Sequence, residues 1–359
     1  MKVGLLTFPN SVSYGCVLQM YALYCTVQAM GHEAEVINYQ NRYMKQERHM
    51  GGNTFKGRLR RCVRGIVHRP MYCAFRKFEN KIIRAFPERV FEDSQRLSEI
   101  GNRYDAVICG SDQVWNPDIT NADMSYFLDF CGEKTRRIAY APSFGVVEFT
   151  EELCCKMQRE LRQFYALSVR ETPGKKLVES LTERNVQVVM DPTFFLSTEQ
   201  WIELEEKHPA AHGEYILYFT VRSSKTLLDE AIELSKKTGM KLVIIGGNPI
   251  RKIKKKDNVE YAVDIGPGQW LYLMHNARYI LTNSFHGTAF AINFRKDFYV
   301  EYSAKTNSRL IHILEVLGLT DRVVGTEAIH PTSVNYTIAE RELLQLQKEA
   351  WTYLQQALQ

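Results

Sequence analysis

A short apolar run, a polar turn and a second apolar run follow one another between Tyr279 and Phe294 (YILTNSFHGTAFAINF). The first run is typical of a buried strand, and the second of a buried helix. Thr282-Asn283-Ser284 between them favours a turn and a helix cap. His286 therefore lies where a strand's carboxyl end meets a helix start, the place where open α/β sheets bind ligands, anions in particular. From this stretch alone, a capped turn with a structural histidine is an equal alternative.

The same order of strand, polar turn and helix recurs along the chain, so the pattern predicts parallel sheets. In the first half, predicted strands cover 2–8, 34–39, 104–109, 137–141, 166–169 and 186–189. In the second half, they cover 215–221, 241–245, 259–263, 279–281 and 297–300. A chain of 359 residues is long for one core, so we expect two Rossmann-like domains. The first loop lacks the GxGxxG pattern of a dinucleotide site.

The expected domain boundary lies in a polar stretch between residues 197 and 212. We place the N-terminal domain at 1–196, the C-terminal domain at 213–335 and an amphipathic closing helix at 336–359. A helical insertion at about 42–90 interrupts the first domain.

This insertion is strongly basic. Between Arg42 and Arg84 there are 13 lysines and arginines but two glutamates. The plain interpretation is a helix with a solvated basic face. The functional interpretation is that Lys56–Arg84 contacts the cytoplasmic membrane or the phosphates of a lipid-linked substrate. The patch is local and carries no nucleic-acid-binding motif, so we expect no nucleic acid partner.

The remaining composition indicates a cytoplasmic protein. The eight cysteines include no CxxC pair, which favours reduced thiols. The start, MKVGLLTFPN, is typical of a strand rather than a signal peptide. No apolar run approaches the ~18 residues of a membrane span. No His/Cys cluster indicates a metal site, so we expect no metal.

Seven blocks, in order, carry a resemblance to a known family. They are GLLTFPNSVSYGCVLQMYAL, ICGSDQVWNP, YAPSFG, SVRE, MDPTFFL, TNSFHGTAFAINF and KTNSRLIHILEVLGLTDR. Together they resemble the polysaccharide pyruvyl transferase family from Lys2 to about Arg322. Only 40–103 lacks a matching block, and Ser13 replaces the second Asn of the first block. Two Rossmann-like domains in a GT-B-like arrangement with a C-terminal amphipathic helix are the fold that we expect.

The resemblance implies a transferase that moves the enolpyruvyl unit of phosphoenolpyruvate onto a sugar. The product is a pyruvate ketal, and phosphate is released. The acceptor would be a precursor of a bacterial surface glycan such as capsular polysaccharide or exopolysaccharide, carried on a polyprenyl diphosphate. No cofactor beyond the donor substrate is implied. The expected location is cytoplasmic, with peripheral contact to the inner face of the membrane.

The same resemblance and the strand ends suggest roles for individual residues. His286 would be the general acid, because imidazole exchanges protons near neutral pH. Asp112 would be the base or bind a hydroxyl, with a turn cap as the plain alternative. The expected donor-binding residues are Arg170, Arg222, Ser284, Gly287, Thr288, Lys305 and Arg309. The expected acceptor-binding residues are Asn10, Tyr14, Gln19, Trp115 and Asn116.

Plainer roles remain open for several of them. A structural ion pair would account for Arg170, and simple packing for Trp115. Asp191 would be a turn residue rather than a catalytic carboxylate. Several family members have Arg-Leu-His where this chain has Ser284-Phe285-His286, so Arg309 or Lys305 would replace the missing arginine.

Two other functions compete with the pyruvyl transferase. One is a nucleotide-sugar glycosyltransferase of the GT-B type in glycan assembly, although no acidic ribose-binding residue stands out. The other is a non-catalytic protein that binds a glycan or a lipid phosphate through the basic insertion. Loss of turnover on changing His286 would separate an enzyme from a binding protein.

Overall fold

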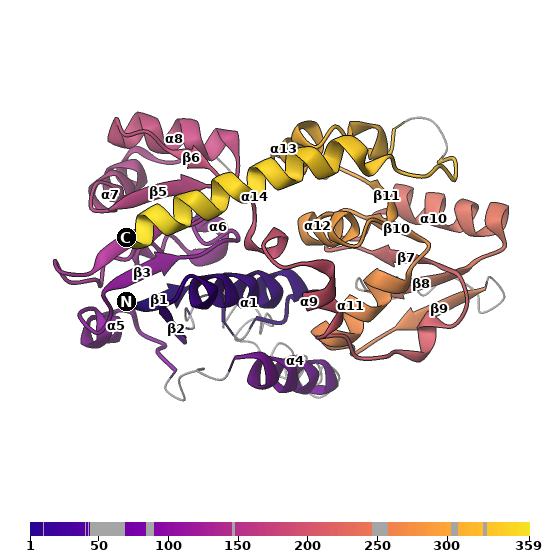
Figure 1. Ribbon diagram of the computed structural model, residues 1–359, viewed down its shortest axis with the longest axis horizontal. Coiled ribbons are helices and arrows are strands. Elements are labelled where there is room, and N and C mark those ends of the chain that lie inside the picture. Colours follow the sequence, from indigo (N-terminus) through magenta and orange to yellow (C-terminus); the bar gives the residue numbers. More distant parts are fainter. Residues whose placement is uncertain are drawn as a thin grey trace, which may run out of the picture. The chain divides into compact units, whose positions relative to one another are not determined.

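The computed structural model describes residues 1–9, 11–39, 41, 43, 69–83, 90–145, 148–245, 258–302, 308–325 and 329–359. The chain divides into two compact units (Figure 1). The N-terminal unit comprises Met1–Phe195 and Gln345–Gln359, and the C-terminal unit comprises Leu196–Leu344. The division falls just before the polar stretch chosen from the sequence. It also assigns the two ends of the closing helix to different units.

Within the described residues, the N-terminal unit holds one sheet of six parallel strands in the order β2-β1-β3-β4-β5-β6. The strands are β1 (Lys2–Leu6), β2 (Glu33–Val36), β3 (Ala106–Cys109), β4 (Arg136–Ala139), β5 (Ala166–Val169) and β6 (Gln187–Val188). Strand β3 is buried along its whole length. That burial matches the continuous apolar runs by which these strands were predicted.

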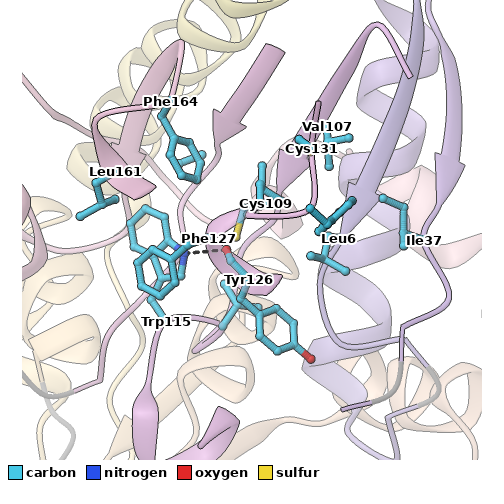
Figure 2. Packing of buried hydrophobic residues seen from close by; sticks show 14 of the residues in the cluster. Leu6, Ile37, Val107, Cys109, Trp115, Tyr126, Phe127, Cys131, Leu161 and Phe164 are labelled. Carbon is cyan, nitrogen blue, oxygen red and sulfur yellow. Dashed lines mark hydrogen bonds between the residues drawn. The ribbon is translucent and has the colours of Figure 1, made fainter. Parts of the chain in front are cut away.

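The helices of this unit follow the strands as expected from parallel crossovers. The α-helices are α1 (Tyr14–Ala29), α4 (Arg69–Ile82), α5 (Ser94–Leu97), α6 (Pro117–Thr120), α7 (Glu151–Leu161) and α8 (Thr172–Thr182). The 3₁₀ helices are η1 (Ser98–Ile100), η2 (Met124–Phe127) and η3 (Pro192–Phe194). Figure 2 shows part of the core that they enclose, where Phe127 stacks on Trp115 at 5.0 Å between ring centroids.

Within the described residues, the C-terminal unit holds one sheet of five parallel strands in the order β11-β10-β7-β8-β9. The strands are β7 (Tyr215–Phe219), β8 (Lys241–Ile245), β9 (Val259–Ala262), β10 (Tyr279–Thr282) and β11 (Asp297–Val300). The α-helices are α9 (Thr198–Ile202), α10 (Lys225–Thr238), α11 (Pro267–Asn276), α12 (Phe285–Asn293) and α13 (Ser308–Val316). The 3₁₀ helices are η4 (Pro209–Ala211) and η5 (Thr320–Arg322).

The last helix, α14 (Tyr336–Leu358), belongs to both units. Near its start, Tyr336 donates a hydrogen bond to the carbonyl of Lys296 in the C-terminal unit. Near its end, Tyr353 donates one to the carbonyl of Ala139, the last residue of β4 in the N-terminal unit. The predicted amphipathic closing helix is therefore present, and its two ends are bonded to different units.

Helix α4 is the described part of the basic insertion. Its apolar face is buried through Phe75, Phe78 and Ile82, whereas Arg76 and Lys77 are exposed. The apolar face thus packs within the protein, and the basic face is the one presented to solvent. The predicted helical stretch 56–68 lies outside the described residues.

None of the helices in the described ranges combines the length and the apolar character that crossing a membrane requires.

Candidate functional site

In each sheet of the described residues, the strand order reverses direction at one place, which is called the switch point. From there the chain adds strands first on one side and then on the other. In the N-terminal unit, β2 and β3 lie on the two sides of β1. In the C-terminal unit, β8 and β10 lie on the two sides of β7. Open parallel sheets bind ligands outside the carboxyl ends of the strands at such points. The loops after β1 and β3, and those after β7 and β10, are therefore the candidate sites.

Asp112 lies at the N-terminal switch point, in the loop after β3. Its φ of 82° is in the left-handed region, which non-glycine residues rarely adopt. The thiol of Cys16, on α1, donates a hydrogen bond to Asp112 Oδ2 at 2.8 Å. The backbone N–H of Gln113 donates one to Oδ1 at 2.8 Å. The Asp112 carboxylate is thus oriented by groups that follow both switch-point strands.

The Cys16 thiol acts here as a hydrogen-bond donor rather than as a nucleophile. Burial, and then the charge of Asp112 and its hydrogen bond, raise the pKa of Cys16 far above its usual value. A thiol that keeps its proton can donate to a carboxylate but is a poor nucleophile.

Arg170 follows β5, and it brings three loops together. Its Nη1 lies 2.8 Å from Asp191 Oδ2 and 3.4 Å from Ser111 Oγ. Its Nη2 lies 3.8 Å from Asp112 Oδ1. Ser111 Oγ also donates to Asp191 Oδ2 at 2.8 Å. The loops after β3, β5 and β6 therefore meet at one edge of the sheet, as the predicted parallel arrangement requires.

Carboxylates of this chain already neutralise the positive charge of Arg170. Burial acts to lower the pKa of Arg170, but Asp191, Asp112 and Glu171 outweigh burial and raise it above its usual value. Because Arg170 is one cation among three carboxylates, this cluster of side chains carries a net negative charge. These contacts support the ion-pair alternative for Arg170, and they provide no excess positive charge for an anionic donor.

Asp191 reaches this group because the chain after β6 turns back across the carboxyl edge of the sheet. Tyr140, which follows β4, donates to the carbonyl of Met190. The helix η3, which follows Asp191, contacts α1. Asp191 also caps η3 by accepting from the N–H and the hydroxyl of Thr193. The predicted turn role of Asp191 is thus correct, but the same side chain also carries the main ion pair of the edge.

The loop after β4 completes the N-terminal site. Ser143 donates through its hydroxyl to Glu171 Oε1 at 2.7 Å and through its N–H to the Asp112 carbonyl at 2.8 Å. Gly145 has a φ of 69°, and a Cβ there would lie 2.3 Å from Gln113 Oε1. Only glycine therefore lets this loop approach the loop after β3 so closely.

The predicted acceptor residues have different surroundings. Gln19 is buried and donates to Thr7 Oγ1 at 2.8 Å, and Thr7 in turn donates to the carbonyl of Ser111. The ring of Tyr14 lies 5.1 Å from that of Phe75 on α4. Through Thr7, Gln19 thus connects to the loop that carries Asp112. Asn10 lies outside the described residues.

The other two predicted acceptor residues belong to one turn. Asn116 caps α6 by accepting from the N–H of Asp118, and its Nδ2 donates to Gln113 Oε1 at 2.9 Å. Trp115 is 1% exposed, and its indole N–H donates to the carbonyl of Tyr126 (Figure 2). Packing in the core therefore accounts for Trp115, which is the alternative to sugar binding given from the sequence.

At the C-terminal switch point, Asn283 joins the two loops. Its Oδ1 accepts from the N–H of Val221 at 3.0 Å, and its Nδ2 donates to the carbonyl of Arg222 at 2.7 Å. Val221 and Arg222 follow β7, whereas Asn283 follows β10. The exposed Arg222 is thereby held at the same switch point as His286.

Ser284 is the N-cap of α12. Its hydroxyl accepts from the N–H of Gly287 at 3.2 Å, and its carbonyl accepts from the N–H and hydroxyl of Thr288. In this structure the N–H groups of Gly287 and Thr288 are thus engaged within the chain. A Cβ on Gly287 would lie 2.4 Å from Thr282 Oγ1, so α12 begins in close contact with β10.

His286 lies in the first turn of α12 and is 8% exposed. The ring of Phe285 meets the imidazole edge-on, at 5.2 Å between centroids. The guanidinium carbon of Arg309, on α13, lies 5.9 Å from the centre of the Phe285 ring. The structure therefore places Arg309 beside the same helix start. Lys305 lies outside the described residues.

No cluster of histidine, cysteine or acidic side chains suited to holding a metal ion occurs among the described residues.

Comparison with known proteins identifies the family. A family model described as polysaccharide pyruvyl transferase matches residues 14–302.

The chain belongs to the polysaccharide pyruvyl transferase family.

This match confirms the family suggested by the sequence blocks, and membership of the pyruvyl transferases makes a transferase the supported enzyme class. A comparison with curated proteins finds no match.

Among solved structures, this pyruvyl transferase family member is similar to two UDP-GlcNAc 2-epimerases. The enzyme from Methanocaldococcus jannaschii shares 11% identity at a TM-score of 0.51, over 97% of this chain and 92% of that one. A putative enzyme from Listeria monocytogenes shares 10% identity at a TM-score of 0.52, over 99% of this chain and 90% of that one. At such identities the likeness shows the fold alone. It confirms the predicted fold class, with two parallel α/β sheets of the GT-B type.

Three contributors to these sites were not singled out from the sequence. Cys16 falls in an apolar helical pattern, which indicated a core residue. Asn283 was assigned only to a turn. Asp191 was given a turn role, yet its position at a strand's carboxyl end is the signal that could have revealed more.

Proposed function

We propose that this protein transfers the enolpyruvyl unit of phosphoenolpyruvate to a sugar of a bacterial surface-polysaccharide precursor. The product would be a pyruvate ketal, formed with release of phosphate. The family match over residues 14–302 carries this proposal. The different charges of the two switch points support it, because the donor is an anion and the reacting part of the acceptor is a neutral sugar.

In the proposal, the C-terminal switch point binds the donor. Phosphoenolpyruvate carries a carboxylate and a phosphate, which favour arginine and hydroxyl donors. Arg222 is exposed there, and no ion pair of Arg222 is found within the described residues. Arg309 lies beside the start of α12, and Ser284 retains its hydroxyl hydrogen for a ligand. Arg309 thus takes the role of the arginine that several relatives have at position 284, and Lys305 remains a second candidate.

His286 is the proposed general acid. Protonation of the donor methylene carbon makes the neighbouring carbon electrophilic, which requires an acid at that carbon. The burial of His286 in the first turn of α12 fixes the ring within its helix. A fixed acid reduces the entropy cost of reaching the transition state.

In the proposal, the N-terminal switch point binds the acceptor. Asp112 accepts the proton of the attacking hydroxyl, and Arg170 holds that carboxylate in place rather than binding the donor. Gln19 supports the same loop through Thr7, and Asn116 contacts it through Gln113. Tyr14, in the first turn of α1, is a further proposed acceptor residue. An acidic site suits sugar hydroxyls, because carboxylates accept their hydrogen bonds.

His286 delivers a proton to the methylene carbon, and one acceptor hydroxyl forms a bond to the adjacent carbon while Asp112 takes its proton. The second hydroxyl then forms the second carbon–oxygen bond as phosphate departs with the electrons of its carbon–oxygen bond, and the proton of that hydroxyl leaves on the phosphate. The proton held by Asp112 passes to solvent, and solvent returns a proton to His286. One donor and one diol thus yield one ketal and one inorganic phosphate, without an oxidant or reductant.

The proposed acceptor is carried on a polyprenyl diphosphate at the cytoplasmic face of the membrane. Support comes from the basic face of α4, where Arg69, Arg76, Lys77 and Lys81 are exposed. Because the apolar face of α4 is buried, contact with a diphosphate or a membrane would be electrostatic and sensitive to salt.

The test is turnover with candidate lipid-linked sugars. Purified protein is incubated with each acceptor and either phosphoenolpyruvate or a panel of nucleotide sugars, and phosphate release and acceptor mass are followed. Phosphate release with a ketal-sized mass gain is the expected result. Turnover with a nucleotide sugar alone would instead establish the glycosyltransferase alternative. Acceptor binding without turnover of either donor would favour a binding protein.

A further inference from the structure

The side-chain amide of Asn283 pairs with the backbone of the neighbouring switch-point loop. It accepts from the N–H of Val221 at 3.0 Å and donates to the carbonyl of Arg222 at 2.7 Å. An amide that uses both its oxygen and its nitrogen fixes the direction of the contact as well as its distance. The backbone of Arg222 is thereby fastened to the loop that leads into α12.

Little else holds this part of the β7 loop. Val221 is 69% exposed, and Arg222 is exposed as well. Across the described ranges, the Asn283 amide supplies all the hydrogen bonds recorded for these two residues. An exposed loop without such contacts would sample several conformations. Arg222 depends on Asn283 for a defined position.

The partner loop is well anchored. Ser284, next to Asn283, donates its N–H to Thr282 Oγ1 at 3.0 Å and accepts from Gly287. Thr282 and Ser284 are both buried. Asn283 therefore transmits the position of a rigid helix start to a weakly held arginine.

We propose that Asn283 is a positioning residue that sets Arg222 for the anionic donor. This inference rests on the proposed function, because Arg222 is taken to contact phosphoenolpyruvate. The amide is required rather than a carboxylate, because aspartate would place an oxygen against the Arg222 carbonyl and lose the donated hydrogen bond. Asn283 touches no substrate in this account and acts through Arg222.

A double-mutant cycle tests the coupling. The variants are Asn283→Ala, Asn283→Asp, Arg222→Ala and the double change Asn283→Ala with Arg222→Ala, all in the full chain. KM for phosphoenolpyruvate, kcat and thermal stability are measured for each. Arg222→Ala should raise KM about tenfold, the loss of one charged hydrogen bond. Asn283→Ala and Asn283→Asp should each raise KM severalfold, with kcat changed much less.

The diagnostic result is the double variant. If Asn283 acts through Arg222, its removal should raise KM no further once Arg222 is absent. If KM of the double variant rises by the product of the two single-variant factors, the inference is overturned. An unchanged KM in Asn283→Ala would also overturn it. Asn276→Ala is the matched control, because Asn276 donates one side-chain hydrogen bond to the Tyr272 carbonyl on an exposed helix end of the same unit. Its KM should stay at the wild-type value.

Failure of the proposed function gives a different outcome. If the wild-type protein neither binds nor turns over phosphoenolpyruvate, the donor assignment falls and the inference with it. If the wild type uses phosphoenolpyruvate but Arg222→Ala leaves KM unchanged, the function stands while the inference is overturned.

Discussion

The guanidinium of Arg170 lies 2.8 Å from the carboxylate of Asp191, and both side chains are almost fully buried. A buried charge that loses its partner is strongly destabilising, because it has left water without compensation. Arg170 therefore couples the stability of the N-terminal unit to the geometry around Asp112.

Asp191→Asn should weaken the fold. The amide can still accept from Thr193, so the cap of η3 is retained while the charge is lost. We expect the free energy of unfolding to fall by about 3 kcal/mol, measured by urea denaturation. Glu152→Gln is the control, because Glu152 pairs with Lys156 on an exposed helix surface. Equal stabilities of the two variants would contradict the buried ion pair.

Asp112→Asn should separate catalysis from donor binding. The amide keeps the size of the side chain but cannot take a proton. We expect kcat to fall about a hundredfold or more, with KM for phosphoenolpyruvate close to that of the wild type. A steady-state assay with the acceptor in excess measures both. If Asp112 is only a turn residue, kcat will stay within a few-fold of the wild-type value.

Cys16 should matter through the hydrogen bond that it donates. Serine keeps a donor at this position and alanine does not. We therefore expect Cys16→Ser to retain most of the wild-type kcat. Cys16→Ala should lower kcat, as Asp112→Asn does. Initial rates for the three proteins provide the test. Full activity in Cys16→Ala would show that the thiol does not orient the carboxylate.

The same thiol should give the stability a pH dependence. Burial and Asp112 raise the pKa of Cys16 in the folded protein, whereas an unfolded cysteine ionises at about pH 8.5. A raised folded-state pKa contributes stability that is fully present below the unfolded pKa and is lost as the pH rises above it. Between pH 8 and 10, roughly, wild-type stability should fall more steeply than that of Cys16→Ser. Parallel curves in urea titrations would argue against this contribution.

Gly287→Ala should disturb the start of α12. A Cβ at this position would lie 2.4 Å from Thr282 Oγ1 and 3.0 Å from Phe219 Cδ1, so helix and strand must separate. We expect lower thermal stability and loss of turnover. Gly325→Ala is the control in the same unit, because a Cβ there meets nothing within 4 Å. Wild-type melting and activity in Gly287→Ala would show that the helix start tolerates displacement.

Much of the fold could be predicted from the sequence because its strands are buried on both faces. Such strands appear as continuous apolar runs, and a strand of the structure overlaps each predicted range. Helix α8 (Thr172–Thr182) was not predicted from the sequence, and it has Pro173 near its start. Proline is tolerated in the first turn of a helix, and it lies there in α8.

The candidate sites were harder to predict than the strands. The sequence placed Asp112, Arg170 and His286 at strand ends, and the structure confirms those positions. It could not show that Arg170 is balanced by Asp191, because that pairing depends on chain crossing several strands after β6. Nor could it show that Ser284 already holds the Gly287 N–H, since a cap and a ligand compete for the same group.

The most direct test of the central claim follows carbon from phosphoenolpyruvate into the acceptor. Phosphoenolpyruvate labelled with ¹³C is incubated with a lipid-linked sugar acceptor and either the wild type or His286→Gln, and the acceptor is examined by mass spectrometry. The account predicts that the wild type transfers all three donor carbons as a ketal with one phosphate released per ketal, and that His286→Gln does not. Labelled product formed equally by both proteins would contradict the role of His286, and unlabelled acceptor with the wild type would contradict the proposed reaction.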